Sequence, residues 1–144
     1  MENFKLEIAE EEKSNRPLKY LTLGSDESKD ILANIAALCE VYESKESSLF
    51  SALNESLNNE VLYRGEVTKS FIETLLLKDK YPLDAICYII WSPQENIDQF
   101  KIDDLIKDWE YIWYATSDEA VILYMPYLNR IALVTDHGII KTNF

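Results

Sequence analysis

The chain has 144 residues, 47% of them hydrophobic and 28% charged, so it can bury a core without the help of a metal or a disulfide. Its 26 acidic and 14 basic residues give a formal charge of −12 at pH 7. That charge argues against nucleic acids and anionic membranes as partners, because both repel a negative surface, and it favours a basic partner. The length predicts a single domain over residues 1–144.

The first residues lack the basic stretch and the long apolar core of a secretory signal, and the longest apolar runs are too short to span a bilayer. We therefore expect a cytoplasmic protein. Cys39 and Cys87 are the two cysteines, and each lies within an apolar pattern. Such a setting predicts two buried, reduced thiols, with a disulfide or a catalytic thiol as the alternatives.

The N-terminal segment has two interpretations. Phe4, Leu6 and Ile8 alternate with polar residues, which is typical of a short strand. Phe4 and Ile8 are also four residues apart, so the same segment fits a helix that continues into the acidic run Glu10–Glu12. We expect that acidic run to be exposed to solvent.

Three amphipathic helices are predicted next. The strongest pattern spans Asp26–Glu43, and Ser25-Asp26 can form its N-cap. A second segment, Leu49–Leu57, ends at two asparagines and is followed by a short strand at Val61–Tyr63. Thr68 can cap the third helix, whose apolar face begins at Phe71.

After Pro82 the pattern changes to strands. Ala85–Trp91 is apolar and nearly unbroken, which predicts a central strand, and Ile102–Trp109 has the spacing of a short helix. Four further strands are predicted at Tyr111–Thr116, Ala120–Met125, Arg130–Thr135 and Ile139–Thr142. Helices first and strands last predict an α+β fold, with N-terminal helices packed on one face of a mainly antiparallel C-terminal β-meander.

Most catalytic templates are absent from the sequence, and the 26 acidic residues leave a two-carboxylate hydrolase open. The three glycines are far apart, so no phosphate-binding loop is present, and no Cys or His cluster has zinc spacing. We therefore expect no cofactor, no metal and no enzymatic activity. In Asp136-His137-Gly138 the aspartate and the glycine suit a turn, and a functional His137 stays open as the alternative.

Acidic residues are concentrated between Gln94 and Ala120, a segment that contains eight acidic residues and two basic residues. A solvated helix face explains this cluster, and so does a docking surface for a basic protein. Aromatic residues lie beside the acids and are typical anchors of protein interfaces; alternation along a strand would put Tyr111 and Trp113 on one face and Tyr114 on the other. The candidate partner-binding residues are Asp103, Asp104, Asp108, Glu110, Tyr111, Tyr114, Asp118 and Glu119.

Three segments in the C-terminal part share a pattern with a known group of proteins. They are Trp109–Tyr114, the turn and strand Ser117–Tyr124, and Ile131–Gly138. Together they resemble small bacterial proteins of the toxin-immunity type. The resemblance implies a single acidic domain that binds and blocks a toxin encoded by a neighbouring gene, and it assigns no individual contact residue.

Three functions follow as hypotheses. In the first, the chain is an immunity protein whose carboxylates occupy the phosphate contacts of a basic, nuclease-type toxin domain and occlude its active site. In the second, it is an acidic regulator or a nucleic-acid mimic. In the third, it is a small hydrolase that uses His137 and a carboxylate as acid–base groups. The oligomeric state stays open in all three.

Overall fold

The structure of the chain is a computed structural model that describes residues 1–12, 18–41, 49–62, 67–77, 82–92, 96–114, 120–135 and 139–144. The helices are α1 (Asn3–Glu12), α2 (Ser25–Leu38), α3 (Leu49–Ser56), α4 (Lys69–Leu76), α5 (Ile102–Ile112) and the 3-10 turn η1 (Pro126–Leu128). The strands are β1 (Leu21–Thr22), β2 (Asn59–Leu62), β3 (Ile86–Trp91), β4 (Asn96–Lys101), β5 (Ala120–Met125), β6 (Arg130–Thr135) and β7 (Ile139–Thr142).

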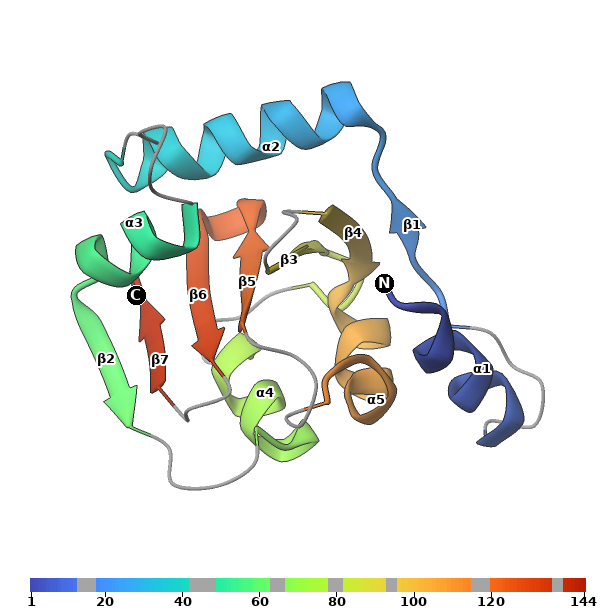
Figure 1. Cartoon of the computed structure of the whole chain (residues 1–144). Helices are drawn as coiled ribbons and strands as arrows, with labels where there is room; N and C mark the ends of the chain where they lie inside the picture. Colours follow the sequence, from blue (N-terminus) through green and yellow to red (C-terminus); the bar gives the residue numbers. More distant parts are fainter. Residues whose placement is uncertain are drawn as a thin grey trace.

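In the described part of the chain, seven strands form one antiparallel sheet in the order β1-β4-β3-β5-β6-β7-β2 (Figure 1). Strands β5, β6 and β7 form the predicted meander, and β3 and β4 form a hairpin that pairs with β5 through β3. The two edge strands, β1 and β2, come from the N-terminal half. The α+β class and the order of helices and strands are confirmed.

Helices cover both faces of the sheet, because the central strands are apolar on both sides. Cys87 and Ile89 of β3 pack in a core with residues of α1, α4 and α5. Ile90, from the same strand, packs on the opposite face with residues of α2 and α3. The expectation that helices cover one face alone is therefore wrong. The unbroken apolar runs of β3 and β5 are the sequence signal of burial on two sides.

The helix ends follow local chemistry. The N-terminal segment is the helix α1, so the strand interpretation of Phe4–Ile8 is wrong. Helix α2 has Gly24 at its N-cap and ends at Leu38, before the predicted end. Thr68 caps α4 as predicted, since its Oγ1 accepts a hydrogen bond from the backbone N–H of Phe71 at 3.3 Å.

Two elements in the C-terminal half differ from the prediction. The predicted strand at Tyr111–Thr116 is wrong for residues 111–114, because α5 continues to Ile112, which lies at helical spacing from Trp109, and residues 115 and 116 lie outside the described part of the chain. The strand β4 was not expected, because Asp98 occupies a buried position and interrupts its apolar alternation. The predicted strands β5, β6 and β7 are confirmed with the same bounds.

Both described cysteines are free thiols, as predicted, although only Cys87 is fully buried and Cys39 is half-buried. Burial raises the pKa of Cys87 strongly and that of Cys39 to a lesser degree. An unfolded cysteine loses its proton near pH 9.0, whereas folded Cys87 keeps its proton. The native state therefore binds more protons than the unfolded state above that pH.

We expect the free energy of unfolding to fall as the pH rises above about 9, by up to about 1.4 kcal/mol per pH unit from Cys87. Urea unfolding at several pH values between about 7 and 10 measures this slope. In Cys87→Ala the slope should become shallower by the contribution of this thiol. Equal slopes in the two proteins would show that Cys87 ionises alike in the folded and unfolded states.

Candidate functional site

Helix α5 separates apolar from charged side chains around its axis. Ile102, Leu105, Ile106, Trp109 and Ile112 are buried. The remaining side carries Asp103, Asp104, Lys107, Glu110 and Tyr111. Residues three, four and seven apart share one side of a helix, so the sequence brings these groups together on the side that faces solvent. We call Asp103, Asp104, Glu110 and Tyr111 the α5 acidic face.

The first turn of α5 is fixed by the residues that precede β3. The backbone N–H of Asp103 donates to the carbonyl of Leu83 at 3.0 Å, and that of Ile102 donates to the carbonyl of Ala85 at 2.9 Å. The carboxylates of Asp103 and Asp104 lie in the first turn of α5, where acidic side chains interact favourably with the helix dipole and stabilise the helix.

Lys107 offsets part of this negative charge. Its Nζ lies 2.7 Å from Oδ2 of Asp103 in an exposed pair one helical turn apart. The hydrogen bond from Lys107 to Asp103 and the charge of Asp103 raise the pKa of Lys107. Because solvent and salt screen exposed pairs of this kind, a partner's cations can compete with Lys107 for Asp103.

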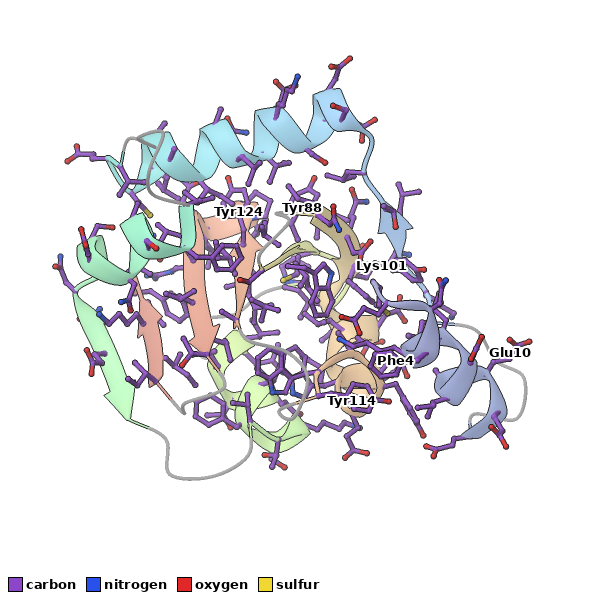
Figure 2. The ribbon with its side chains drawn as sticks, viewed as in Figure 1. Phe4, Glu10, Tyr88, Lys101, Tyr114 and Tyr124 are labelled. Atoms are coloured by element: carbon purple, nitrogen blue, oxygen red, sulfur yellow. The ribbon has the colours of Figure 1, made fainter. Side chains whose placement is uncertain are left out.

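Not all of the predicted residues lie on this face. Asp108 is only 8% exposed and already has a contact within the fold, so it adds little charge to the surface. Tyr114 is half-buried, and its ring packs edge-on against Phe4 of α1, with 5.4 Å between centroids (Figure 2). Asp118, Glu119 and His137 lie outside the described residues.

The alternating arrangement expected for the aromatic residues is wrong, because no strand forms there. Tyr111 is on the half-exposed side of α5. Trp113 is buried and stacks on Trp109, with 6.1 Å between ring centroids. Of the predicted aromatic anchors, Tyr111 is therefore the one that lies on the α5 acidic face.

A buried polar cluster that sequence reasoning missed fastens the N-terminal elements to the sheet. Asp98 of β4 is fully buried, and its carboxylate accepts from Trp91 Nε1 at 2.9 Å and from Thr22 Oγ1 at 2.7 Å. The amino group of Met1 lies 2.9 Å from Asp98 Oδ2. Lys5 is also buried and holds its Nζ 4.2 Å from the ring centroid of Trp91. The signal in the sequence is an acid between Ile97 and Phe100, both apolar.

A second missed feature is a pocket of about 350 Å³ where α2 and α3 end beside β2 and β7. We call it the helix-end pocket, and its polar lining consists mainly of Cys39, Glu40, Ser56, Asn58, Asn59 and Asn143. In the sequence, Asn58 and Asn59 indicate only the end of a helix. Nothing in the local pattern indicates that Glu40 and Asn143, about a hundred residues apart in the chain, line one cavity.

In the part of the chain that the structure describes, no three His, Cys, Asp or Glu side chains gather in a way that could hold a metal ion. Across the same residues, no helix combines the length and the apolar character needed to cross a membrane. Comparisons with protein-family models, with curated proteins and with solved structures find nothing that matches the chain.

Proposed function

We propose that the protein is an immunity-type inhibitor that binds a basic toxin domain through the α5 acidic face. The observation that carries this proposal is the gathering of Asp103, Asp104 and Glu110 beside Tyr111 on one side of α5. Carboxylates presented in this way suit the cationic groups with which a nuclease holds phosphates. A half-exposed tyrosine among them offers the aromatic anchor typical of tight interfaces.

The neighbouring helix α1 adds to the negative field around this face. It packs against α5, and its glutamates Glu7, Glu10, Glu11 and Glu12 are exposed. Figure 2 shows Glu10 on the outer side of α1, pointing away from the sheet. Charges around a binding surface accelerate the encounter with an oppositely charged partner and act over about 10 Å at ordinary ionic strength. We therefore assign α1 to steering and α5 to contact.

The proposal predicts that neutralising the α5 acidic face abolishes tight binding. In the variant with Asp103→Asn, Asp104→Asn and Glu110→Gln, we expect the affinity for the toxin domain encoded beside this gene to fall more than tenfold. Close interfacial charge pairs couple by about 1.5 kcal/mol or more, which is itself about tenfold. Calorimetric titration across a salt series measures the loss, and co-expression measures protection from the toxin.

The matched control is the variant with Glu10→Gln, Glu11→Gln and Glu12→Gln, which removes the same charge from the adjacent helix. We expect it to slow association and to leave the dissociation rate nearly unchanged, because rim charges act mainly on encounter. Wild-type affinity in the α5 variant would place the contact surface elsewhere. Failure of the wild-type protein to bind the toxin domain or to protect against it would refute the proposed function.

A further inference from the structure

The helix-end pocket lies at the β7–β2 edge of the sheet, whereas α5 packs near β3 and β4. Figure 1 shows α2 and α3 both ending on the side of the molecule where β2 begins and where the C-terminus lies. The residues that follow the two helices, Cys39 and Glu40 after α2 and Leu57 and Asn58 after α3, line the cavity. Its volume of about 350 Å³ is within the range of small-molecule sites.

The pocket is surrounded by hydrogen-bond acceptors and negative charge. The C-terminal end of a helix carries about half a negative elementary charge, and neither α2 nor α3 has a basic residue in its own last turn, although Lys141 of β7 reaches the end of α3. Glu40 adds a carboxylate and Asn58 an amide oxygen, whereas the amide oxygen of Asn143 already accepts a hydrogen bond from the backbone N–H of Ile131 at 2.8 Å. The hydroxyl oxygen of Ser56 is buried and has no hydrogen-bond partner in the described part of the chain. These groups suit a ligand that is a cation and a hydrogen-bond donor.

Glu40 occupies its position at a cost. Its φ is 54°, in the left-handed region that non-glycine residues rarely adopt, and helices usually place Gly or Asn there. A carboxylate at the negative end of α2 is also electrostatically unfavourable. The left-handed turn lets the backbone N–H groups of Glu40 and Val41 cap the carbonyls of Ala37 and Ala36 at the end of α2, but a glycine would form the same cap without strain, so the turn does not explain the glutamate side chain.

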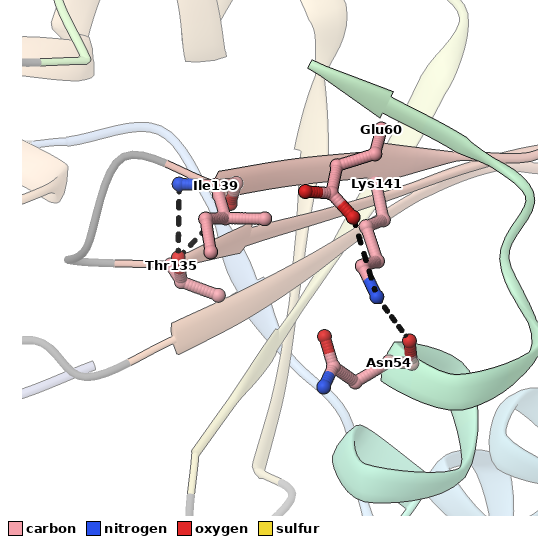
Figure 3. A network of polar contacts seen from close by, with 5 residues as sticks. All are labelled: Asn54, Glu60, Thr135, Ile139 and Lys141. Carbon is pink, nitrogen blue, oxygen red and sulfur yellow. Dashed lines mark hydrogen bonds and ion pairs between the residues drawn. The ribbon is translucent and has the colours of Figure 1, made fainter. Parts of the chain in front are cut away.

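The chain already uses a cation beside the pocket. The ammonium group of Lys141 donates to the backbone carbonyl of Asn54 in the last turn of α3, and its Nζ lies 3.7 Å from Oε2 of Glu60 (Figure 3). This contact shows that the end of α3 accepts an ammonium group. Because Lys141 pairs with Glu60, the two side chains together add no net charge beside the pocket.

We propose that the helix-end pocket binds a cationic group, either a primary ammonium or a guanidinium. The group comes from a free small amine or from a lysine or arginine side chain of a polypeptide, and the two sources present the same chemistry to Glu40. The site is independent of the α5 acidic face, so it stands whether or not the toxin partner is found.

The test is a titration of the isotopically labelled full chain, followed by NMR through its amide signals. Methylammonium and methylguanidinium chlorides are the probes, and tetramethylammonium chloride is the control, because it carries the same charge and no donor. We expect saturable shifts at millimolar concentration, confined to Cys39, Glu40, Asn58, Asn59 and Asn143, for the two donor cations alone. Absence of saturable shifts, or equal shifts with tetramethylammonium, would overturn the proposal.

Two substitutions separate binding from folding. Glu40→Gly relieves the left-handed strain, so we expect it to raise the melting temperature while it weakens methylguanidinium binding at least fivefold. Glu40→Gln keeps a non-glycine residue at the left-handed backbone position and removes only the negative charge. It should weaken methylguanidinium binding to a similar degree. Glu73→Gln, on α4 and remote from the pocket, is the charge-matched control and should leave binding unchanged.

Unchanged affinity in both Glu40 variants would also overturn the proposal, even if the wild type binds. The source of the cation follows from a second pair of probes, the N-acetylated peptide amides of Gly-Arg-Gly and Gly-Lys-Gly, whose side chain carries the one cationic group. Binding more than tenfold tighter than that of methylguanidinium supports a polypeptide side chain as the occupant, because the flanking backbone then adds contacts. Equal or weaker binding supports a small amine.

Discussion

Replacing Trp109 with phenylalanine is expected to destabilise the protein by about 3 kcal/mol, whereas the same change at Trp113 should cost about 1 kcal/mol or less. Both indoles are buried in the same core and stack on each other. Trp109 Nε1 donates to the carbonyl of Val67 at 2.7 Å, which ties α5 to the residue before the Thr68 cap. Replacing the Trp109 indole with the smaller phenyl ring leaves a cavity, and it leaves the buried carbonyl of Val67 without its hydrogen-bond donor.

Trp113 provides the matched comparison because its Nε1 is buried with no hydrogen-bond partner among the described residues. Phenylalanine removes that unsatisfied donor, and this gain offsets part of the lost packing. Urea unfolding with unchanged m-values measures both variants. If the two substitutions cost the same, the Trp109–Val67 hydrogen bond does not stabilise the fold and packing alone sets the cost.

Asp98→Ala is expected to cost about 3–5 kcal/mol, because it removes one partner of a buried ion pair and leaves the other charge uncompensated. The substitution also deprives the Trp91 indole and the Thr22 hydroxyl of their acceptor. Helix α1 and strand β1 should loosen first, because Asp98 contacts both segments through Met1 and Thr22. Hydrogen exchange of residues 1–12 and 21–22 measures the local effect, and urea unfolding measures the global effect.

Thr22→Val is the control for the same cluster. It removes one hydrogen bond to Asp98 while it keeps the carboxylate and its contacts with Trp91 and Met1. We expect it to cost about 1 kcal/mol. An Asp98→Ala variant as stable as Thr22→Val would mean that the buried pair contributes no more than a single hydrogen bond.

Local sequence patterns predicted those helices and strands whose position is set by residues close together in the sequence. Ala120–Met125 and Arg130–Thr135 are rich in residues that favour strands and are bounded by turn residues, so both strands were predicted correctly. Thr68 is a capping residue before an apolar helix face, so the start of α4 was also predicted correctly. Strand β4 was missed because the buried Asp98 interrupts the alternation of apolar and polar residues that identifies a strand. The burial of its carboxylate is compensated by Trp91 and by the N-terminal amino group, which are distant from it in the local pattern. The aromatic run at Tyr111 favours a strand by propensity, and the packing of Ile112 overrides that propensity.

The two candidate sites differ in how far sequence can predict them. The α5 acidic face follows from composition and helical spacing, and Asp108 is buried because it lies three and four residues from Leu105 and Ile112. The helix-end pocket depends on the meeting of two helix ends with β2 and β7, which is set by the whole sheet. The left-handed backbone of Glu40 is likewise invisible in the sequence, which offers no glycine at that position.

The pairing of both edge strands with C-terminal partners affects how the chain folds as it is synthesised. Strand β1 pairs with β4, and β2 pairs with β7. Each edge strand is therefore synthesised many residues before the strand with which it pairs. The apolar faces of α2 and α3 likewise pack on β3, β5 and β6, which leave the ribosome later. The helical half therefore emerges without its sheet and is exposed to chaperones and proteases during translation, at about 5–20 residues per second. Closure of such distant contacts also favours slow folding.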